Sequence, residues 1–243
     1  MWTSRRLGPL AGLLFLCAAF PSLAWAPETR VRMTDEAVRF MPPSLRLALE
    51  KHRSALLRGM LQPLKQESAD EHRAPGEGGS LDASVAAEAA ALTAMLEEPT
   101  PFARIAEQFG RLAHYVADGG FPPGVGAGGD ARYKHFGKFC ESRRERFRLV
   151  FYGHDDPALE RGDYRAYMLD VIERAAESDG RLAPIYARHA EHGHASDFDD
   201  RSVPFAVGSL SYSRSINDVV RVWLTVWERA GGDLSRTPYM TFD

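Results

Sequence analysis

Apolar side chains recur at helical spacing along most of the chain, and no segment alternates with comparable strength at the period of a strand. The clearest stripe comprises Phe102, Ile105, Phe109, Leu112 and Val116. Similar patterns predict helices at about residues 43–60, 80–96, 130–147, 164–176, 182–189 and 203–230. The sequence therefore predicts an all-α fold, a multi-helix bundle.

Glycine, proline and charged residues separate the predicted helices. Residues 62–80 form a predicted loop that contains His72, and residues 119–129 are predicted to lack any regular element. No linker in the sequence requires a second domain. Residues 25–243 are long enough to form one sizeable core, and we expect them to form a single domain.

The first 24 residues are typical of a signal peptide. Arg5 and Arg6 precede an apolar run, and small residues offer cleavage sites after Ala24 or Ala26. The apolar run is shorter than the roughly 20 residues that a membrane-spanning helix needs, and no later stretch approaches that length. We therefore expect export to the periplasm or the extracellular space, with no transmembrane segment.

Charge and cysteine content narrow the expected function. Cleavage after Ala24 would remove two of the 30 basic residues and none of the 33 acidic ones, which changes the net charge from −3 to −5. This charge argues against duplex nucleic acid as a partner. Cys140 would be the one remaining cysteine, so an intramolecular disulfide is excluded and stability must come from packing.

His114 and Asp118 carry the most suggestive chemistry in the chain. They lie four residues apart on a predicted helix, so both side chains project from one face and can share a cation. The alternative is an ordinary solvated face, because Glu107 and Arg111 belong to the same polar stripe. His52 lies on an apolar stripe and is predicted to be a hydrogen-bonded core residue rather than a ligand.

Residues 189–200 form a second candidate for metal binding. This segment is rich in histidine and aspartate and contains His189, His192, His194, Asp197, Asp199 and Asp200. Such tracts can bind metal, but in a glycine- and serine-containing loop they are more often solvated.

The chain resembles the superfamily of zinc-dependent phospholipase C and fungal single-strand-specific zinc nucleases. The signature helix of that superfamily ends in His-aromatic-x-x-Asp and is followed by a proline-containing loop. Here the corresponding residues are His114-Tyr115-Val116-Ala117-Asp118, followed by Gly-Gly-Phe-Pro-Pro. The resemblance implies an all-α zinc phosphodiesterase fold and a mature chain that begins at a metal-binding tryptophan.

The resemblance also implies a set of zinc ligands, with Trp25 at the mature N-terminus. The upstream histidine corresponds to His72 and the later one to His135, and Asp70 or Glu67 is a possible replacement acid. Other positions depart from the family pattern. Val31–Thr34 lack the early histidine, and Leu64 follows Pro63 where the family commonly has an aspartate. Gly124 stands where a histidine is expected and Phe139 where an acid is expected, with Glu141 nearby but out of register. One to three zinc ions are implied, and one agrees best with the remaining ligands.

Two classes of function remain open from the sequence. The first is an exported zinc-dependent phosphoesterase that acts on phospholipid head groups or nucleotide-type phosphodiesters, with reduced activity because ligands are missing. The second is a catalytically inactive helical binding or structural protein that retains one metal site or none.

Overall fold

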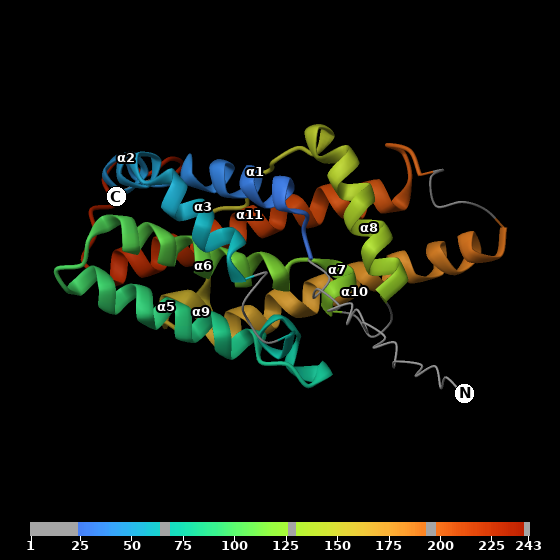
Figure 1. Ribbon diagram of the computed structural model, residues 1–243, viewed down its shortest axis with the longest axis horizontal. Helices are drawn as coiled ribbons and strands as arrows, with labels where there is room; N and C mark the ends of the chain where they lie inside the picture. Colours follow the sequence, from blue (N-terminus) through green and yellow to red (C-terminus); the bar gives the residue numbers. More distant parts are fainter. Residues whose placement is uncertain (1–23, 64–68, 126–129, 193–197, 241–243) are drawn as a thin grey trace, which may run out of the picture.

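The computed structural model describes residues 24–63, 69–125, 130–192 and 198–240. Within these ranges every regular element is an α-helix or a 3-10 helix, which confirms the predicted all-α class (Figure 1). Except for Ala24, the predicted signal peptide lies outside the described residues. None of the described helices has both the length and the apolar character needed to cross a membrane.

Three helices open the described chain: α1 (Pro27–Val38), α2 (Pro43–Lys51) and α3 (Arg53–Leu61). Prolines begin α1 and α2, where the missing N–H would have had no partner within the helix. The predicted single helix over residues 43–60 is wrong, because His52 leaves the helical region at φ −107° and ψ 26°. His52 is half-buried against the Phe102 ring at this junction instead of lying in the core.

The central helix is α6 (Phe102–Gly119), which packs against α3 and against α5 (Leu81–Glu97). Glycines allow the close approach of α3 and α6. A Cβ atom on Gly59 would collide with the Glu107 carbonyl, and one on Gly110 would collide with the Leu56 carbonyl. The two backbones therefore pass each other at a distance that only glycine permits.

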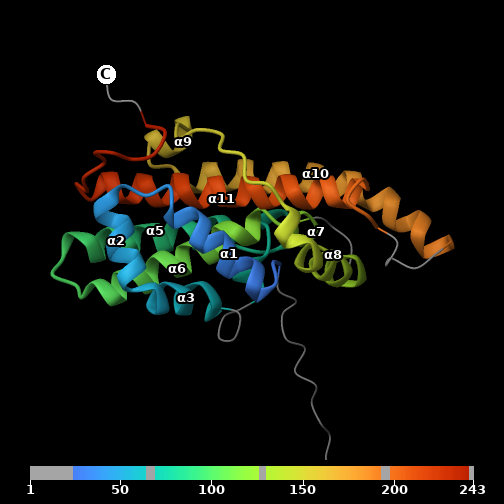
Figure 2. The same cartoon turned by 90° about the horizontal axis from the view of Figure 1, so that it is seen from above.

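Two long helices, α10 (Tyr164–His192) and α11 (Val203–Arg229), lie side by side in one layer, with α3 and α6 on the other side of the core (Figure 2). The prediction of separate helices over 164–176 and 182–189 is wrong, because α10 continues through residues 177–181, which include Gly180. Its apolar face stays buried before and after the predicted break, at Val171, Ala175 and Leu182. Burial of this continuous face outweighs the low helix propensity of the polar, glycine-containing segment between the two predicted helices.

The remaining elements of the described chain are α8 (Asp130–Arg143) and five short helices, η1 (Ala69–His72), η2 (Pro75–Glu77), α7 (Pro122–Val125), η3 (Arg144–Arg146) and α9 (Pro157–Glu160). The prediction that residues 119–129 lack a regular element is wrong for the described part, where α7 forms a single turn. Paired prolines at its start fix the backbone dihedral that a first helical turn requires. The side chain of Asp156 caps α9 by accepting hydrogen bonds from the amides of Ala158 and Leu159.

Candidate metal centre

The last turns of α6 carry His114 and Asp118 into the interior. The His114 side chain is fully buried and Asp118 is 5% exposed. The alternative interpretation of this stripe as a solvated face is therefore wrong at its C-terminal end. The interpretation as a solvated face fits better one or two turns earlier in α6. There Glu107 and Arg111 are partly exposed, and they form ion pairs with Arg58 and Glu88 respectively.

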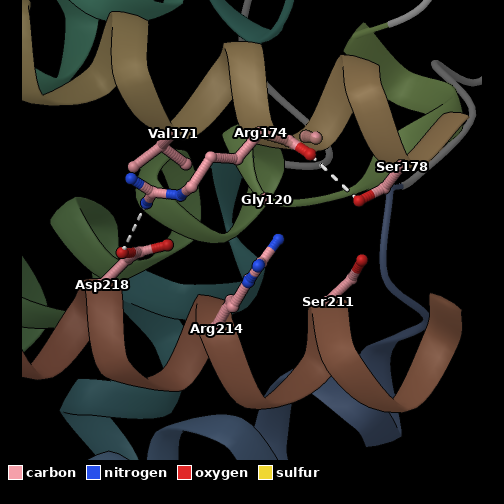
Figure 3. Close-up of a pocket in the computed structure, with 8 residues that line it drawn as sticks. Gly120, Val171, Arg174, Ser178, Ser211, Arg214 and Asp218 are labelled. Carbon is pink, nitrogen blue, oxygen red and sulfur yellow. Dashed lines mark hydrogen bonds and ion pairs between the residues drawn. The ribbon is translucent and has the colours of Figure 1, made fainter. Parts of the chain in front are cut away.

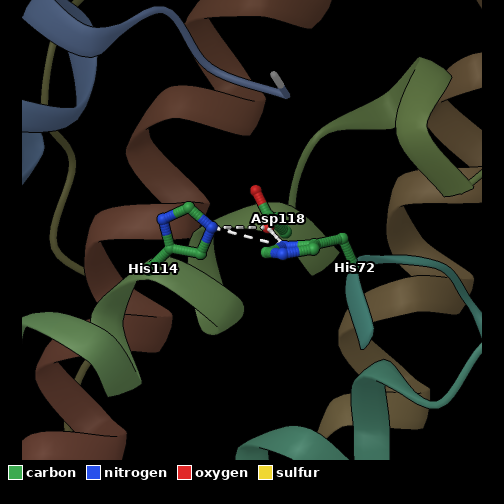
Figure 4. A group of neighbouring side chains, drawn as sticks. All are labelled: His72, His114 and Asp118. Atoms are coloured by element: carbon green, nitrogen blue, oxygen red, sulfur yellow. Dashed lines mark hydrogen bonds and ion pairs between the residues drawn. The ribbon is translucent and has the colours of Figure 1, made fainter. Parts of the chain in front are cut away.

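His72 joins this pair from η1, more than 40 residues upstream. Its Nδ1 lies 2.7 Å from Asp118 Oδ2 and 3.3 Å from His114 Nε2, and His114 Nε2 lies 3.1 Å from Asp118 Oδ2 (Figure 4). The His72 ring also stacks on Tyr115. With 16% of its side chain exposed, His72 is the member of the group nearest to solvent.

The Met60 carbonyl fixes the orientation of the His114 ring. It lies 2.8 Å from His114 Nδ1 and can only accept, so the proton of the neutral ring belongs on Nδ1. Arg30 Nη1 lies 3.2 Å from the same nitrogen, but both atoms then carry hydrogens and this contact is not a hydrogen bond. Burial lowers the pKa of His114, although the nearby Asp118 carboxylate acts in the opposite direction. The net lowering favours the neutral ring. Its Nε2 lone pair therefore faces Asp118 and His72.

Asp118 divides its two carboxylate oxygens between two sets of partners. Oδ2 faces the two imidazoles, whereas Oδ1 pairs with Nη2 of the fully buried Arg30. Burial alone would raise the pKa of Asp118, but the charge of Arg30 holds it well below its usual value. The carboxylate is therefore ionised in the folded protein.

The three facing atoms suit one zinc ion. Ligand atoms around a tetrahedral zinc with bonds of about 2.0–2.1 Å lie about 3.3 Å apart. Two of the observed separations, 3.1 and 3.3 Å, are close to that value, and the third, between His72 Nδ1 and Asp118 Oδ2, is shorter at 2.7 Å. A neutral imidazole lone pair directed at a carboxylate oxygen is also an arrangement that a cation stabilises. His72, His114 and Asp118 are the single group of this kind among the residues that the structure describes.

Trp25 lies beside this centre, and its backbone carbonyl accepts a hydrogen bond of 2.9 Å from Arg30 Nε. Its indole is fully buried and donates to the Ala117 carbonyl at 3.1 Å. Of the candidate replacement acids, Asp70 pairs with Arg73, and Glu67 lies outside the described residues. Glu71, which the sequence did not single out, lies 3.3 Å from the Tyr115 hydroxyl.

The structure places His135 apart from the group of three. Its Nδ1 lies 2.7 Å from the Tyr186 hydroxyl, and its ring contacts Phe198. The ring of His189 also packs on Phe198, so this member of the second candidate cluster has an aromatic neighbour. Residues 193–197 of that cluster lie outside the described part of the chain.

The positions that depart from the family pattern have packing roles in the fold. Phe139 is buried between the rings of Phe136 and Phe198, and Gly124 lies close to Tyr133. The out-of-register Glu141 accepts hydrogen bonds from the amide and hydroxyl of Thr29. These packing and hydrogen-bonding contacts explain why the residues are found at these positions, and none of them requires a metal ion.

Arg30 is the residue at this centre that sequence reasoning missed. It directly precedes the segment Val31–Thr34, in which the expected histidine is absent. A signal was available, because Arg30 lies on the same helical face as Met33 and Ala37, both buried. An arginine on an apolar stripe must find acceptors in the interior, and here it finds them at Asp118, Trp25 and His114.

A small pocket lies between α10 and α11, with Gly120 among its lining residues (Figure 3). Arg174 crosses it to pair with the buried Asp218 at 3.0 Å, and Asp218 also accepts a 2.6 Å hydrogen bond from Tyr167. Arg214, Ser178 and Ser211 add further polar side chains to its lining. These contacts join the two long helices, and the pocket contains none of the predicted ligands.

Comparisons with known proteins show a similarity of fold to two solved structures. No family model and no curated protein matches the sequence. Among solved structures, alpha-toxin from an avian strain of Clostridium perfringens superposes with a TM-score of 0.65 at 10% identity, covering 86% of this chain and 66% of the toxin. The alpha toxin of Clostridium absonum gives 0.60 at 13% identity, covering 88% and 66%. The chain thus spans about two thirds of each toxin's length, and the similarity is one of fold, in agreement with the all-α class that the resemblance implied.

Proposed function

We propose that this protein is an exported, zinc-binding phosphoesterase-like protein that holds one zinc ion through His72, His114 and Asp118. The observation that carries the proposal is the convergence of these three ligand atoms at separations suited to one tetrahedral ion. The resemblance to zinc-dependent phospholipases and nucleases directs the proposal toward phosphodiesters, with phospholipid head groups or nucleotides as the substrate class. Export would follow cleavage after Ala24 or Ala26.

The residues around the proposed ion have distinct tasks. His114 is oriented by the Met60 carbonyl, and Asp118 by Arg30, so two ligands are positioned before metal binds. His72 is the most exposed of the three proposed ligands, so a substrate would approach from its side. A zinc ion bound there would lower the pKa of a bound water to about 7 and polarise a phosphoryl oxygen.

Hydrolysis is expected to be weak. Efficient phosphodiester cleavage in multinuclear sites uses neighbouring cations to stabilise the attacking and leaving oxygens. Gly124 and Phe139 offer neither imidazole nor carboxylate for such a neighbour, and Phe139 is packed among aromatic rings. A single ion would therefore supply part of the stabilisation of the transition state.

The alternative is a catalytically inactive binding or structural protein, and Arg30 is the observation that favours it. Its ion pair with Asp118 neutralises the carboxylate in the interior without a metal. A site whose charges are already balanced can persist in the folded state after catalysis has been lost.

Zinc content tests the proposal. We expect about one zinc per chain in protein purified from its export compartment, and near-complete loss of zinc in His114→Ala, because one of three protein ligands is removed. His52→Ala is the matched control, since His52 lies against Phe102 outside the site, and should retain zinc. Stability should fall with zinc loss, because binding that requires the folded geometry adds to the folding free energy.

Activity on a generic phosphodiester separates the two classes. Weak turnover that chelation abolishes and zinc restores supports the phosphoesterase. Zinc binding without turnover supports the inactive alternative. Wild-type protein that binds no zinc, with unchanged stability in His114→Ala, contradicts the proposed site.

A further inference from the structure

Arg30 presents a positive charge to the same group of atoms that would hold a metal ion. Its guanidinium has no exposed surface. Nε donates to the Trp25 carbonyl at 2.9 Å, Nη1 to the His114 carbonyl at 3.4 Å, and Nη2 to Asp118 Oδ1. All three acceptors are oxygens, the ligand atoms that a hard cation also requires.

Neither solvent nor a surface ion pair compensates the charge of Arg30, because the side chain is fully buried. Moving a guanidinium into the interior is unfavourable unless an opposite charge and hydrogen-bond acceptors compensate it. Here Asp118 supplies the charge and two backbone carbonyls supply the acceptors. The side chain thus occupies the space between Trp25 and Asp118 and bonds to an oxygen of each.

We propose that the Arg30 guanidinium is a built-in cation that takes the place of a second metal ion and limits the centre to one weakly held ion. This inference rests on the zinc site proposed above. Asp118 Oδ2 remains directed at the two histidines, whereas Oδ1 and the Trp25 carbonyl are committed to Arg30. A second ion would need these committed oxygens.

The arrangement also weakens the remaining site. Arg30 Nη2 pairs with Asp118 Oδ1 while Oδ2 of the same carboxylate faces the two histidines, so one carboxylate group separates the guanidinium from any ion bound there. Like charges repel across this short separation, and the partly desolvated surroundings screen them less than water does. Arg30 therefore keeps Asp118 satisfied when no metal is bound and opposes metal binding.

Zinc titration of the full chain after chelator treatment, followed by calorimetry, tests this inference. We expect Arg30→Met to bind zinc at least tenfold more tightly than the wild type, because the opposing charge is gone and both Asp118 oxygens become available. Arg32→Met is the matched control, because it removes a guanidinium from the same helix at a position where Arg32 pairs with Glu145. Its zinc affinity should stay within threefold of the wild type.

A second measurement covers the possibility that Arg30→Met is unfolded without metal. Its helical circular dichroism should then return when zinc is added, because a dication can replace the missing guanidinium beside Asp118. Arg30→Met that stays unfolded with zinc, or that folds and binds zinc no more tightly than the wild type, overturns the inference.

The two proposals fail in different ways. Wild type that binds one zinc, with equal or weaker binding in Arg30→Met, contradicts the role of Arg30 and leaves the zinc site intact. Wild type that binds no zinc, with one zinc bound by Arg30→Met, contradicts the proposed function and supports Arg30 as the replacing cation.

Discussion

At the scale of single residues, the ion pair between Arg30 and Asp118 is expected to have a large effect on stability. Both side chains are buried, so removing one charge leaves the other without compensation. The pair between Arg53 and Asp35 has similar chemistry but is largely exposed. The two pairs therefore offer a comparison in which burial is the main difference.

We expect Asp118→Asn to lower the free energy of unfolding of the chelator-treated protein by about 3–5 kcal/mol, because Arg30 becomes an unpaired buried charge. Asp35→Asn should change it by no more than about 1 kcal/mol, because solvent screens that pair. Urea denaturation measures both variants. Equal losses in the two variants would contradict the burial argument.

The pH dependence of stability should report on His114. Its folded-state pKa is lowered by burial, so its contribution is complete above the unfolded value of 6.5 and declines as the pH falls below it. The pKa of Asp118 is also lowered, so its contribution is lost at more acidic pH, below its ordinary value of 3.8. These two windows do not coincide.

We therefore expect the chelator-treated wild type to lose stability as the pH falls from 7 to 5. His114→Gln should show a shallower slope over this range, because the group that must take up a proton on unfolding is absent. Chemical denaturation at a series of pH values measures the slopes. Parallel slopes for the two proteins would show that His114 does not titrate in this way.

At the scale of elements, the contact between α3 and α6 connects packing to the metal centre. Gly110 on α6 faces the α3 backbone close to Met60, whose carbonyl orients His114. The same contact thus determines how closely the helices pack and where one ligand points.

We expect Gly110→Ala to destabilise the protein by about 1–3 kcal/mol, because its Cβ would force the helices apart. Zinc affinity should fall as well, since the Met60 carbonyl moves away from His114. Gly180→Ala is the control: no atom lies within 4 Å of the new Cβ, and alanine favours the helix by about 0.5–1 kcal/mol. Unfolding and zinc titrations check both variants, and an unchanged Gly110→Ala would contradict the close approach.

At the scale of the whole molecule, Trp25 links the predicted export signal to the folded core. Its indole is fully buried, contacts Phe121 and Tyr212, and donates to the Ala117 carbonyl. Removal of a buried tryptophan side chain costs about 3–5 kcal/mol. Cleavage after Ala24 keeps this residue, whereas cleavage after Ala26 removes it.

We therefore expect the exported protein to begin at Trp25. Intact mass of protein from the export compartment measures this directly, and a recombinant chain that starts at Pro27 should be the less stable of the two. A native mass that corresponds to Pro27 as the first residue would exclude Trp25 from any role in the metal centre.

Helical class and part of the site followed from local spacing. The stripe through Phe102–Val116 predicted α6, and the same spacing placed His114 and Asp118 on one face. The resemblance added His72 as a partner. Local patterns did not predict the break at His52 or the continuity of α10 through residues 177–181, because long-range packing decides both.

The sequence by itself determined the helical fold class, the face that His114 and Asp118 share, and the absence of several expected ligands. Only the tertiary structure decided that this face is buried and that Arg30 neutralises Asp118. The reason is physical: helical periodicity fixes the direction of a side chain relative to its neighbours within a few turns. Compensation of a buried charge depends on contacts between distant segments, and here Arg30 and Asp118 are 88 residues apart.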